Sequence, residues 1–430
     1  MKYSVVTFGC RVNQADSFGF EEELLATGAI AASVEEADLI VVNTCSVTAT
    51  ADQGARQTIR RIARQNPGAR IVVTGCYATR RPSEVGELPN VARVVSNDDK
   101  PRLLQLLTHV DVAQGGSPVV MTSADRFGDG DGSCGAAIEP GVAGRTAFTL
   151  RVQTGCAETC AYCIIPTTRG RPRSLPVDDV VREVRRVART GFKEIALTGV
   201  HLGSYGRDLI PATTLIDLLR RLAADRLPGD VLFRISSLEP MDCTPAIVAL
   251  VAESGHFAPH FHLPLQHASD RVLAAMRRPY TFGYYEALVR SIRQSIPDAS
   301  IGSDIIVGFP GETDEDFQQL ATYLERSPLT HIHVFPYSDR PGTTATAMGG
   351  KVHGAIVRER GRRIREISAR LTAGFLDAQV GSVHRALTLE DGSLAVTGNY
   401  LKVRIPPGRV RNEWVSIRLV SHHHGELLSG

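Results

Sequence analysis

The sequence predicts an α/β protein of three units: a small doubly wound parallel-sheet domain, a central partial (βα)6 barrel and a small antiparallel β domain. Its 430 residues are too many for one hydrophobic core. Short apolar runs alternate with helix-like periods over most of the length, which is typical of β-α units. The end of the chain instead carries short strand-like runs. We place the units at 1–110, 147–375 and 376–430, with a linker at 111–146.

The amino-terminal unit repeats a strand and then a helix. Because such repeats build parallel sheets covered by helices, we expect a small doubly wound domain here. The expected strands are 3–9, 38–44, 70–75 and 91–96, and the expected helices are 16–28, 50–65 and 98–109. The linker that follows is rich in glycine and turn formers and has no periodicity.

In the central unit the β-α rhythm returns six times. The expected strands are "FTLRVQTG", "EIALTGV", "VLFRISSL", "HFHLPLQ", "IGSDIIVGF" and "THIHVFPYS". Six units suit a partial or open βα barrel better than a complete one of eight, and ligands of such folds bind at the carboxyl ends of the strands. A charged helical stretch at 353–380 then leads into the last unit, where the expected strands are "VHRALTLE", "LAVTGN", "LKVRI" and "WVSIRLV".

Composition argues against a membrane-spanning protein, a secreted protein and a disulfide-stabilised scaffold. No run of eighteen apolar residues occurs, and the start "MKYSVVTFGC" lacks the basic and apolar regions of a signal peptide. We therefore expect a cytoplasmic protein with no membrane partner. Eight cysteines are too few for a disulfide scaffold, and in a reducing compartment clustered thiols are more often metal ligands or redox groups.

Three of these cysteines lie close together in "GCAETCAYC", directly after the first strand of the central unit. Cys156, Cys160 and Cys163 would stand in one loop at the ligand-binding edge, where three thiolates can hold three irons of a cubane cluster and leave one iron open. Zinc is the alternative, but no second CxxC or HxxxH lies nearby. Coincidental free thiols are the other alternative.

Three further cysteines are far apart in sequence, yet each ends an expected strand. Cys10, Cys45 and Cys76 follow "VVTFG", "LIVVNT" and "RIVVTG". Parallel strands bring their carboxyl ends together, so we expect a second three-thiolate site at that edge. The structural alternative is that these are ordinary buried cysteines. Cys134 and Cys243 have no partner at metal spacing and receive no role, and the "SHHHG" at 421–425 is expected to be a solvated tail.

At these residues the chain resembles the radical S-adenosylmethionine (SAM) methylthiotransferase family over nearly its whole length. The x3, x2 spacing of the central cysteines is the signature of the radical SAM superfamily, and the family's three amino-terminal cysteines match the second set. Within the family, the branch that modifies N6-threonylcarbamoyladenosine in tRNA is the most similar. The segments that carry this similarity are "TFGCRVNQADS", "NTCSVTATAD", "LTGVHLGSYGRDL", "MRRPYT", "DIIVGFPGETDEDF" and "HVFPYSDRPGTTA". One departure is "LPLQHASD", where His267 and Ala268 replace a serine-glycine pair common in relatives.

The resemblance implies two 4Fe-4S clusters, with SAM as the second cofactor. The cluster on Cys156, Cys160 and Cys163 is implied to chelate SAM and to release a 5′-deoxyadenosyl radical. The second cluster is implied to carry the sulfur that is inserted. Such a radical is needed because C2 of an adenine offers neither an acidic proton nor an easy route for a nucleophile.

Further contacts follow from the same resemblance. Glycines of two loops are expected to let the backbone approach SAM, and three polar residues on barrel strands are expected to contact SAM or the target base. Each of the polar residues has an ordinary satisfied polar group as its alternative. The glycines are Gly199, Gly203, Gly308 and Gly311, and the polar residues are Arg234, Ser236 and Asp304.

The last unit resembles the small RNA-binding barrel called TRAM. Between Leu394 and Val420 it carries five Lys or Arg residues and one acidic residue, which can supply phosphate contacts. The implied partners are the anticodon stem-loop of tRNA and a reductant such as a flavodoxin or ferredoxin, and we expect a monomer. Two rival functions stay open: a metal-containing RNA-binding protein without catalysis, and a radical enzyme acting on isopentenyladenosine or on a ribosomal-protein aspartate.

Overall fold

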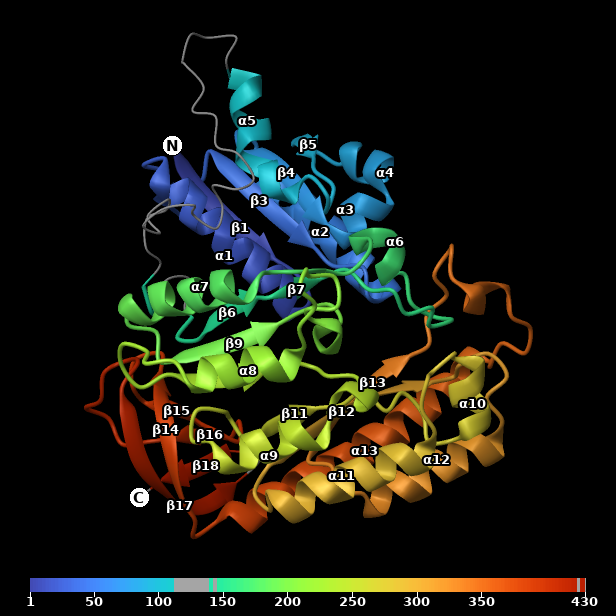
Figure 1. The fold of residues 1–430 in the computed structure, drawn as a ribbon. Helices are drawn as coiled ribbons and strands as arrows, with labels where there is room; N and C mark the ends of the chain where they lie inside the picture. The colour runs from blue at the N-terminus through green and yellow to red at the C-terminus, as the bar shows by residue number, and fades with distance from the viewer. Residues whose placement is uncertain (112–138, 142–144, 424–425, 430) are drawn as a thin grey trace.

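The structure is a computed structural model that describes residues 1–111, 139–141, 145–423 and 426–429 (Figure 1). Most of the expected linker, including Cys134, lies outside these residues, as does part of the 421–425 tail. In Figure 1 the amino-terminal domain (blue) lies above a central βα array (green to orange), and a small β barrel (red) lies at its lower left. The predicted α/β class is confirmed. Within the described residues, no helix has the length and apolarity needed to span a membrane.

The amino-terminal domain is a parallel sheet of five strands in the order β2-β1-β3-β4-β5. The strands are β1 (Lys2–Thr7), β2 (Ile30–Ala31), β3 (Leu39–Thr44), β4 (Arg70–Gly75) and β5 (Val91–Val94). The helices are α1 (Arg11–Ala26), α2 (Ala49–Gln65), α3 (Cys76–Arg80), α4 (Pro82–Gly86) and α5 (Leu103–Asp111), the last preceded by the 3-10 turn η1 (Lys100–Arg102). One core, with Ile40 and Ile59, lies between the sheet and α2, and another, with Leu24 and Val41, lies on the α1 side. Helices therefore cover both faces, as a doubly wound domain requires.

The central array contains the six predicted strands as two parallel three-stranded sheets, β10-β9-β6 and β11-β12-β13. They are β6 (Phe148–Arg151), β9 (Glu194–Thr198), β10 (Leu232–Ile235), β11 (His260–His262), β12 (Ser300–Val307) and β13 (His331–Pro336). The main helices are α7 (Val177–Arg189), α8 (Leu215–Ala223), α9 (Pro245–Glu253), α11 (Phe282–Ser295), α12 (Asp314–Arg326) and α13 (Gly354–Gln379). The shorter elements are β7 (Gln153–Thr154), α6 (Ile165–Arg169), β8 (Arg173–Ser174), η4 (Leu202–Ser204), η5 (Pro240–Asp242), α10 (Asp270–Ala275) and η6 (Thr344–Ala347).

Side chains alternate along these strands between an apolar outer face and a polar inner face. Ile195, Phe233 and Ile301 belong to the hydrophobic core shared with the helices. Their neighbours on the opposite face are polar, and they interact with one another across the strands. These inner residues are Glu194, Arg234, His260, His262, Asp304, His331 and His333. The barrel interior is therefore a polar chamber.

The carboxyl-terminal unit is a closed barrel in the order β14-β15-β16-β18-β17. Its strands are β14 (Val383–Leu389), β15 (Leu394–Thr397), β16 (Lys402–Arg404), β17 (Trp414–His423) and β18 (Glu426–Ser429). The four predicted strands are confirmed, but β18 was missed because its four residues lie beside the polar "SHHHG". The unit is antiparallel as expected except at one pairing: β16 pairs with β18 in parallel, and this pairing closes the barrel.

Tyr400, between β15 and β16, connects this small barrel to the central chamber. Its ring centroid lies 4.5 Å from Cζ of Arg234 and 5.0 Å from the ring of His260. Its hydroxyl accepts a hydrogen bond from Nη2 of Arg11 at 3.2 Å. One tyrosine of the last unit thus contacts both of the other units.

Asp16 of α1 connects the amino-terminal domain to the central array. Its carboxylate lies 2.7 Å from Nζ of Lys100 and 3.4 Å from Nη2 of Arg169, and it also pairs with Arg151. The carboxylate is buried, which opposes ionisation, but these cations hold the pKa of Asp16 well below its usual range. Two of the cations belong to the central array, so this buried ion cluster spans the boundary.

The unusual "QHAS" segment has a structural role. His267 is fully buried, and its Nδ1 accepts a hydrogen bond from the backbone N–H of Ser269 at 3.0 Å. Burial lowers the pKa of His267 to about 4, so the ring is neutral at pH 7. Ser269 in turn caps α10. The histidine therefore stabilises the turn into α10.

Candidate functional site

The three amino-terminal cysteines converge at the carboxyl edge of the first sheet. Cys10 follows β1, Cys45 follows β3, and Cys76 begins α3 directly after β4. A Cβ placed on Gly9 would clash with Sγ of Cys45, and the thiol of Cys45 interacts electrostatically with those of both Cys10 and Cys76. The predicted convergence of these three sulfurs is therefore present in the structure.

The second set lies in the loop between β7 and α6, where its three thiols also interact with one another. The backbone N–H of Glu158 points to Sγ of Cys156 at 3.4 Å, and that of Ile165 points to Sγ of Cys163 at 3.5 Å. Cys156, Cys160 and Cys163 are all half-buried. Such N–H donors stabilise thiolates, which are the form that binds iron.

Cationic side chains flank this second set. Arg278 places Nη1 3.0 Å from Sγ of Cys160 and pairs through its other amine with Glu239. His201 places Nδ1 3.8 Å from Sγ of Cys156 and Nε2 2.7 Å from Oδ2 of Asp242. Burial opposes protonation of this imidazole, but its bonds to Asp242 and Cys156 raise the pKa of His201 to about 9. These cations therefore offset negative charge beside Cys156 and Cys160, while burial still raises the pKa of Cys160.

The first set has its own cation, and it comes from α6, the short helix that follows the loop of the second set. Arg169 lies six positions after Cys163, and its positive charge acts on the Cys76 thiol. Burial alone would raise the pKa of Cys76, but Arg169 and Lys100 outweigh it and lower that pKa. Asn97 adds a bridge, with Nδ2 3.7 Å from Sγ of Cys76 and 2.8 Å from the carbonyl oxygen of Thr168. Cys76 and Asn97 therefore contact α6, the helix next to the second cysteine loop, across the domain boundary.

The segment after β13 also joins the two cysteine loops. Arg340 donates to Oδ2 of Asp52 at 3.1 Å, and Asp52 pairs with Arg80 near Cys45 and Cys76. The backbone N–H of Ala345 donates to the carbonyl oxygen of Ala161, inside the second loop, at 2.8 Å. The segment from Pro336 to Ala345 therefore contacts both domains beside the two cysteine sets.

The four predicted glycines differ in why a larger residue would not fit: at some a side chain is in the way, and at one the backbone is strained. A Cβ would clash with Asp242 at Gly203 and with Val357 at Gly308, and it would crowd Gln153 at Gly199. At Gly311 the strain is in the backbone, since its φ is 82°. At three of these positions the space is filled by the protein's own side chains, so their contact with SAM stays a prediction.

The three predicted polar residues have different surroundings. Arg234 is fully buried, makes two bonds of 3.0 Å to Glu194 and donates to the carbonyl oxygen of Gly398 at 2.9 Å. These contacts occupy its guanidinium, so we expect Arg234 to join the units rather than to bind SAM. Ser236 has a buried hydroxyl that finds no hydrogen-bond partner among the described residues, as a ligand contact would require. Asp304 lies between two histidines, described below.

Both cysteine sets fit three-thiolate cluster sites. Each offers three cysteine sulfurs, and the thiols of Cys45 and Cys163 interact electrostatically with the other cysteines of their own set. Open iron is what SAM chelation or sulfur attachment requires. Arg278, Arg169 and His201 were missed as site residues, although each lies within or beside a quoted motif; only the fold shows that they face sulfur.

Replacing Gly155 with alanine should displace the loop of the second set. Gly155 has a φ of 76°, and a Cβ there would clash with the carbonyl oxygen of Arg171. Iron content should fall from about eight towards four atoms per chain, because one cluster holds four. Gly374→Ala is the control: no described atom lies within 4 Å of its Cβ position in α13, so it should stabilise the chain by about 1 kcal/mol. Full iron in Gly155→Ala would contradict this account.

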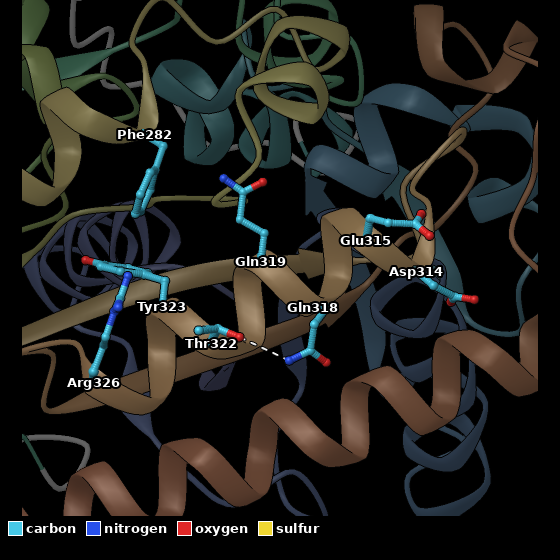
Figure 2. A pocket seen from close by; sticks show the side chains of 8 residues that line it. All are labelled: Phe282, Asp314, Glu315, Gln318, Gln319, Thr322, Tyr323 and Arg326. Carbon is cyan, nitrogen blue, oxygen red and sulfur yellow. Dashed lines mark hydrogen bonds between the residues drawn. The ribbon is translucent and has the colours of Figure 1, made fainter.

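A cavity of about 640 Å³ lies elsewhere, between the start of α11 and the outer face of α12 (Figure 2). Its lining includes Phe282, Tyr323 and Arg326, and Figure 2 shows the hydrogen bond of Gln318 to Thr322 along the same helix. None of the six cysteines lines it. It therefore does not belong to the candidate site.

Comparison with known protein families gives two matches. Residues 150–324 match the radical SAM superfamily, and residues 2–96 match a family described as "Uncharacterized protein family UPF0004". The first match contains Cys156, Cys160 and Cys163, and the second contains Cys10, Cys45 and Cys76.

Similar proteins extend these matches over nearly the whole chain. The "Threonylcarbamoyladenosine tRNA methylthiotransferase MtaB" of Aquifex aeolicus is 37% identical over 94% of this chain and 96% of its own. The "tRNA-2-methylthio-N(6)-dimethylallyladenosine synthase" of Sorangium cellulosum is 35% identical over 90% of this chain and 81% of its own. Among solved structures, the radical SAM methyltransferase TsrM of Kitasatospora setae has a TM-score of 0.58 at 17% identity, covering 80% of this chain and 77% of its own, a likeness of fold alone.

Proposed function

The chain belongs to the radical SAM methylthiotransferase family, and from this premise we propose that it methylthiolates C2 of N6-threonylcarbamoyladenosine next to the anticodon of tRNA. It is a transferase, and its family uses SAM with a 4Fe-4S cluster and carries a second cluster. The observation that carries the proposal is the pair of three-cysteine sets, which lie on either side of the contact between α6 and the Cys76–Asn97 region. The sulfur donor and the radical derived from SAM can then both reach C2 of the same adenine.

The six cysteines take the cluster-binding roles in this proposal. When bound, the cluster on Cys156, Cys160 and Cys163 supplies the electron that cleaves SAM, and the other supplies the sulfur. Arg278 holds positive charge beside Cys160, and Arg169 does so beside Cys76. Ser236, with its unpartnered hydroxyl in the chamber, is the polar residue best placed to meet SAM.

The carboxyl-terminal barrel supplies the tRNA contact. Lys402 and Arg404 lie exposed along β16, where they can meet phosphates. Binding through such contacts falls as salt rises. A flavodoxin or ferredoxin as reductant, a monomeric state and a cytoplasmic location complete the proposal.

Mass spectrometry of tRNA nucleosides tests the substrate. Deleting the gene from its host should remove the methylthio group from the threonylcarbamoyl nucleoside and leave the isopentenyl nucleoside unchanged. The wild-type gene should restore it, and the Cys10, Cys45, Cys76 triple-alanine variant should not. Loss from the isopentenyl form instead would support the function named for the Sorangium cellulosum relative. An unchanged profile of both nucleosides would refute tRNA methylthiolation at these positions.

A further inference from the structure

Two histidines and an aspartate meet inside the central chamber, on three neighbouring strands. His262 ends β11, Asp304 lies in β12, and His333 lies in β13. The register pairs Asp304 with His333 directly and His262 with Gly302, two positions before the aspartate. All three side chains therefore share the inner face of the sheet, and their ligand atoms lie within 4.8 Å of one another.

The spacing of these atoms suits one ion. Oδ1 of Asp304 lies 3.1 Å from Nε2 of His262 and 3.1 Å from Nδ1 of His333. Zinc binds imidazole nitrogen and carboxylate oxygen at 2.0–2.2 Å, so adjacent ligands of a tetrahedral site lie about 3.3 Å apart. The two aspartate–histidine distances are thus close to those between adjacent ligands of one metal ion.

The orientation of His262 also suits a metal ligand. Its buried Nε2 lies 3.1 Å from Oδ1 of Asp304 but does not meet it in hydrogen-bond geometry. Its Nδ1 lies 2.8 Å from Oγ of Ser237. Histidine ligands typically donate their second N–H to such a partner, which leaves the lone pair on the nitrogen that faces the metal.

The three side chains leave one side of the cluster open. The exposed fraction rises from 12% for His262 to 23% for Asp304 and 58% for His333. A metal held here would keep coordination positions facing the chamber, as catalytic sites with two histidines and one carboxylate do. The ring of His331 packs beside those of His262 and His333.

We propose that His262, Asp304 and His333 form a divalent transition-metal site, preferring Zn²⁺, that is separate from both cysteine sets. Gly302 leaves room for the ring of His331 beside the site, since a Cβ there would clash with that ring. The alternative is a plain ion pair between Asp304 and a protonated His333, which would bind no metal.

Equilibrium dialysis of the full-length holoenzyme against Zn²⁺ tests the site, with zinc and iron both counted by mass spectrometry. Every sample carries alanine at His422, His423 and His424, so that the terminal histidines cannot bind the metal. One zinc per chain should bind. Asp304→Asn and His333→Ala should each weaken this binding at least 100-fold, and Ser237→Ala should weaken it about 10-fold.

Two controls keep the result interpretable. His256→Ala, at an exposed histidine outside the cluster, should bind zinc like the parent. Iron should stay at about eight atoms per chain in every variant, which shows that the chain is folded and that zinc has not entered the cysteine sites. No stoichiometric zinc in the parent, or equal binding in Asp304→Asn and His333→Ala, would overturn the proposal.

Discussion

Replacing Cys10, Cys45 and Cys76 together with alanine should lower the iron of anaerobically purified protein from about eight to about four atoms per chain. The three thiols converge on one sheet edge, so their loss should empty one site. Reductive cleavage of SAM to 5′-deoxyadenosine should persist in this variant, whereas methylthio transfer should vanish. Iron analysis and product chromatography measure the two effects.

The triple-alanine variant of Cys156, Cys160 and Cys163 is the matched counterpart. It should lose the same amount of iron but also lose SAM cleavage. Cys134→Ala, a thiol with no partner at metal spacing, should keep full iron. Zinc in place of iron, or iron unaffected by the amino-terminal triple change, would contradict the two-cluster assignment.

Asp16→Ala should destabilise the amino-terminal domain by about 3–5 kcal/mol, because it leaves buried cations without their carboxylate. The side chains of Lys100 and Arg169 are only 5% and 3% exposed, so water cannot replace it. Hydrogen exchange resolved by peptide should show lost protection in β3 and β4. Arg169 would also lose its anchor beside Cys76.

Glu36→Gln is the control in the same domain. Its pair with Lys2 is 3.4 Å long and more than half exposed on both sides, so its loss should cost less than about 1 kcal/mol. Equal protection in the Asp16 and Glu36 variants would show that the buried cluster does not stabilise the domain boundary.

The strands and the cysteine convergence could be predicted because both follow from local pattern. Each of Cys10, Cys45 and Cys76 follows an apolar run, and parallel pairing brings such ends together. The β18 strand could not be predicted, since its pairing with β16 depends on closure of a barrel rather than on its own four residues.

Side-chain partners were harder to predict than strands. Arg234 has the position of a ligand contact, but its actual partners are Glu194 and a loop about 160 residues further along the chain. Nothing local indicates that pairing. The histidines of "HFH" and "HIH" were not predicted as a cluster, although their spacing could have indicated one, because alternate residues of a strand share a face.

The contacts of Tyr400 change how truncation of the last domain should be interpreted. The unit expected to bind RNA also covers part of the barrel interior, because the Tyr400 ring packs on Arg234 and His260. Deleting that unit would let solvent into the barrel as well as weaken RNA binding. A truncated protein could therefore lose activity even on a minimal stem-loop that makes no contact with the deleted unit. Turnover of such a substrate would not separate RNA binding from catalysis. Substitution of Lys402 and Arg404 alone would separate them.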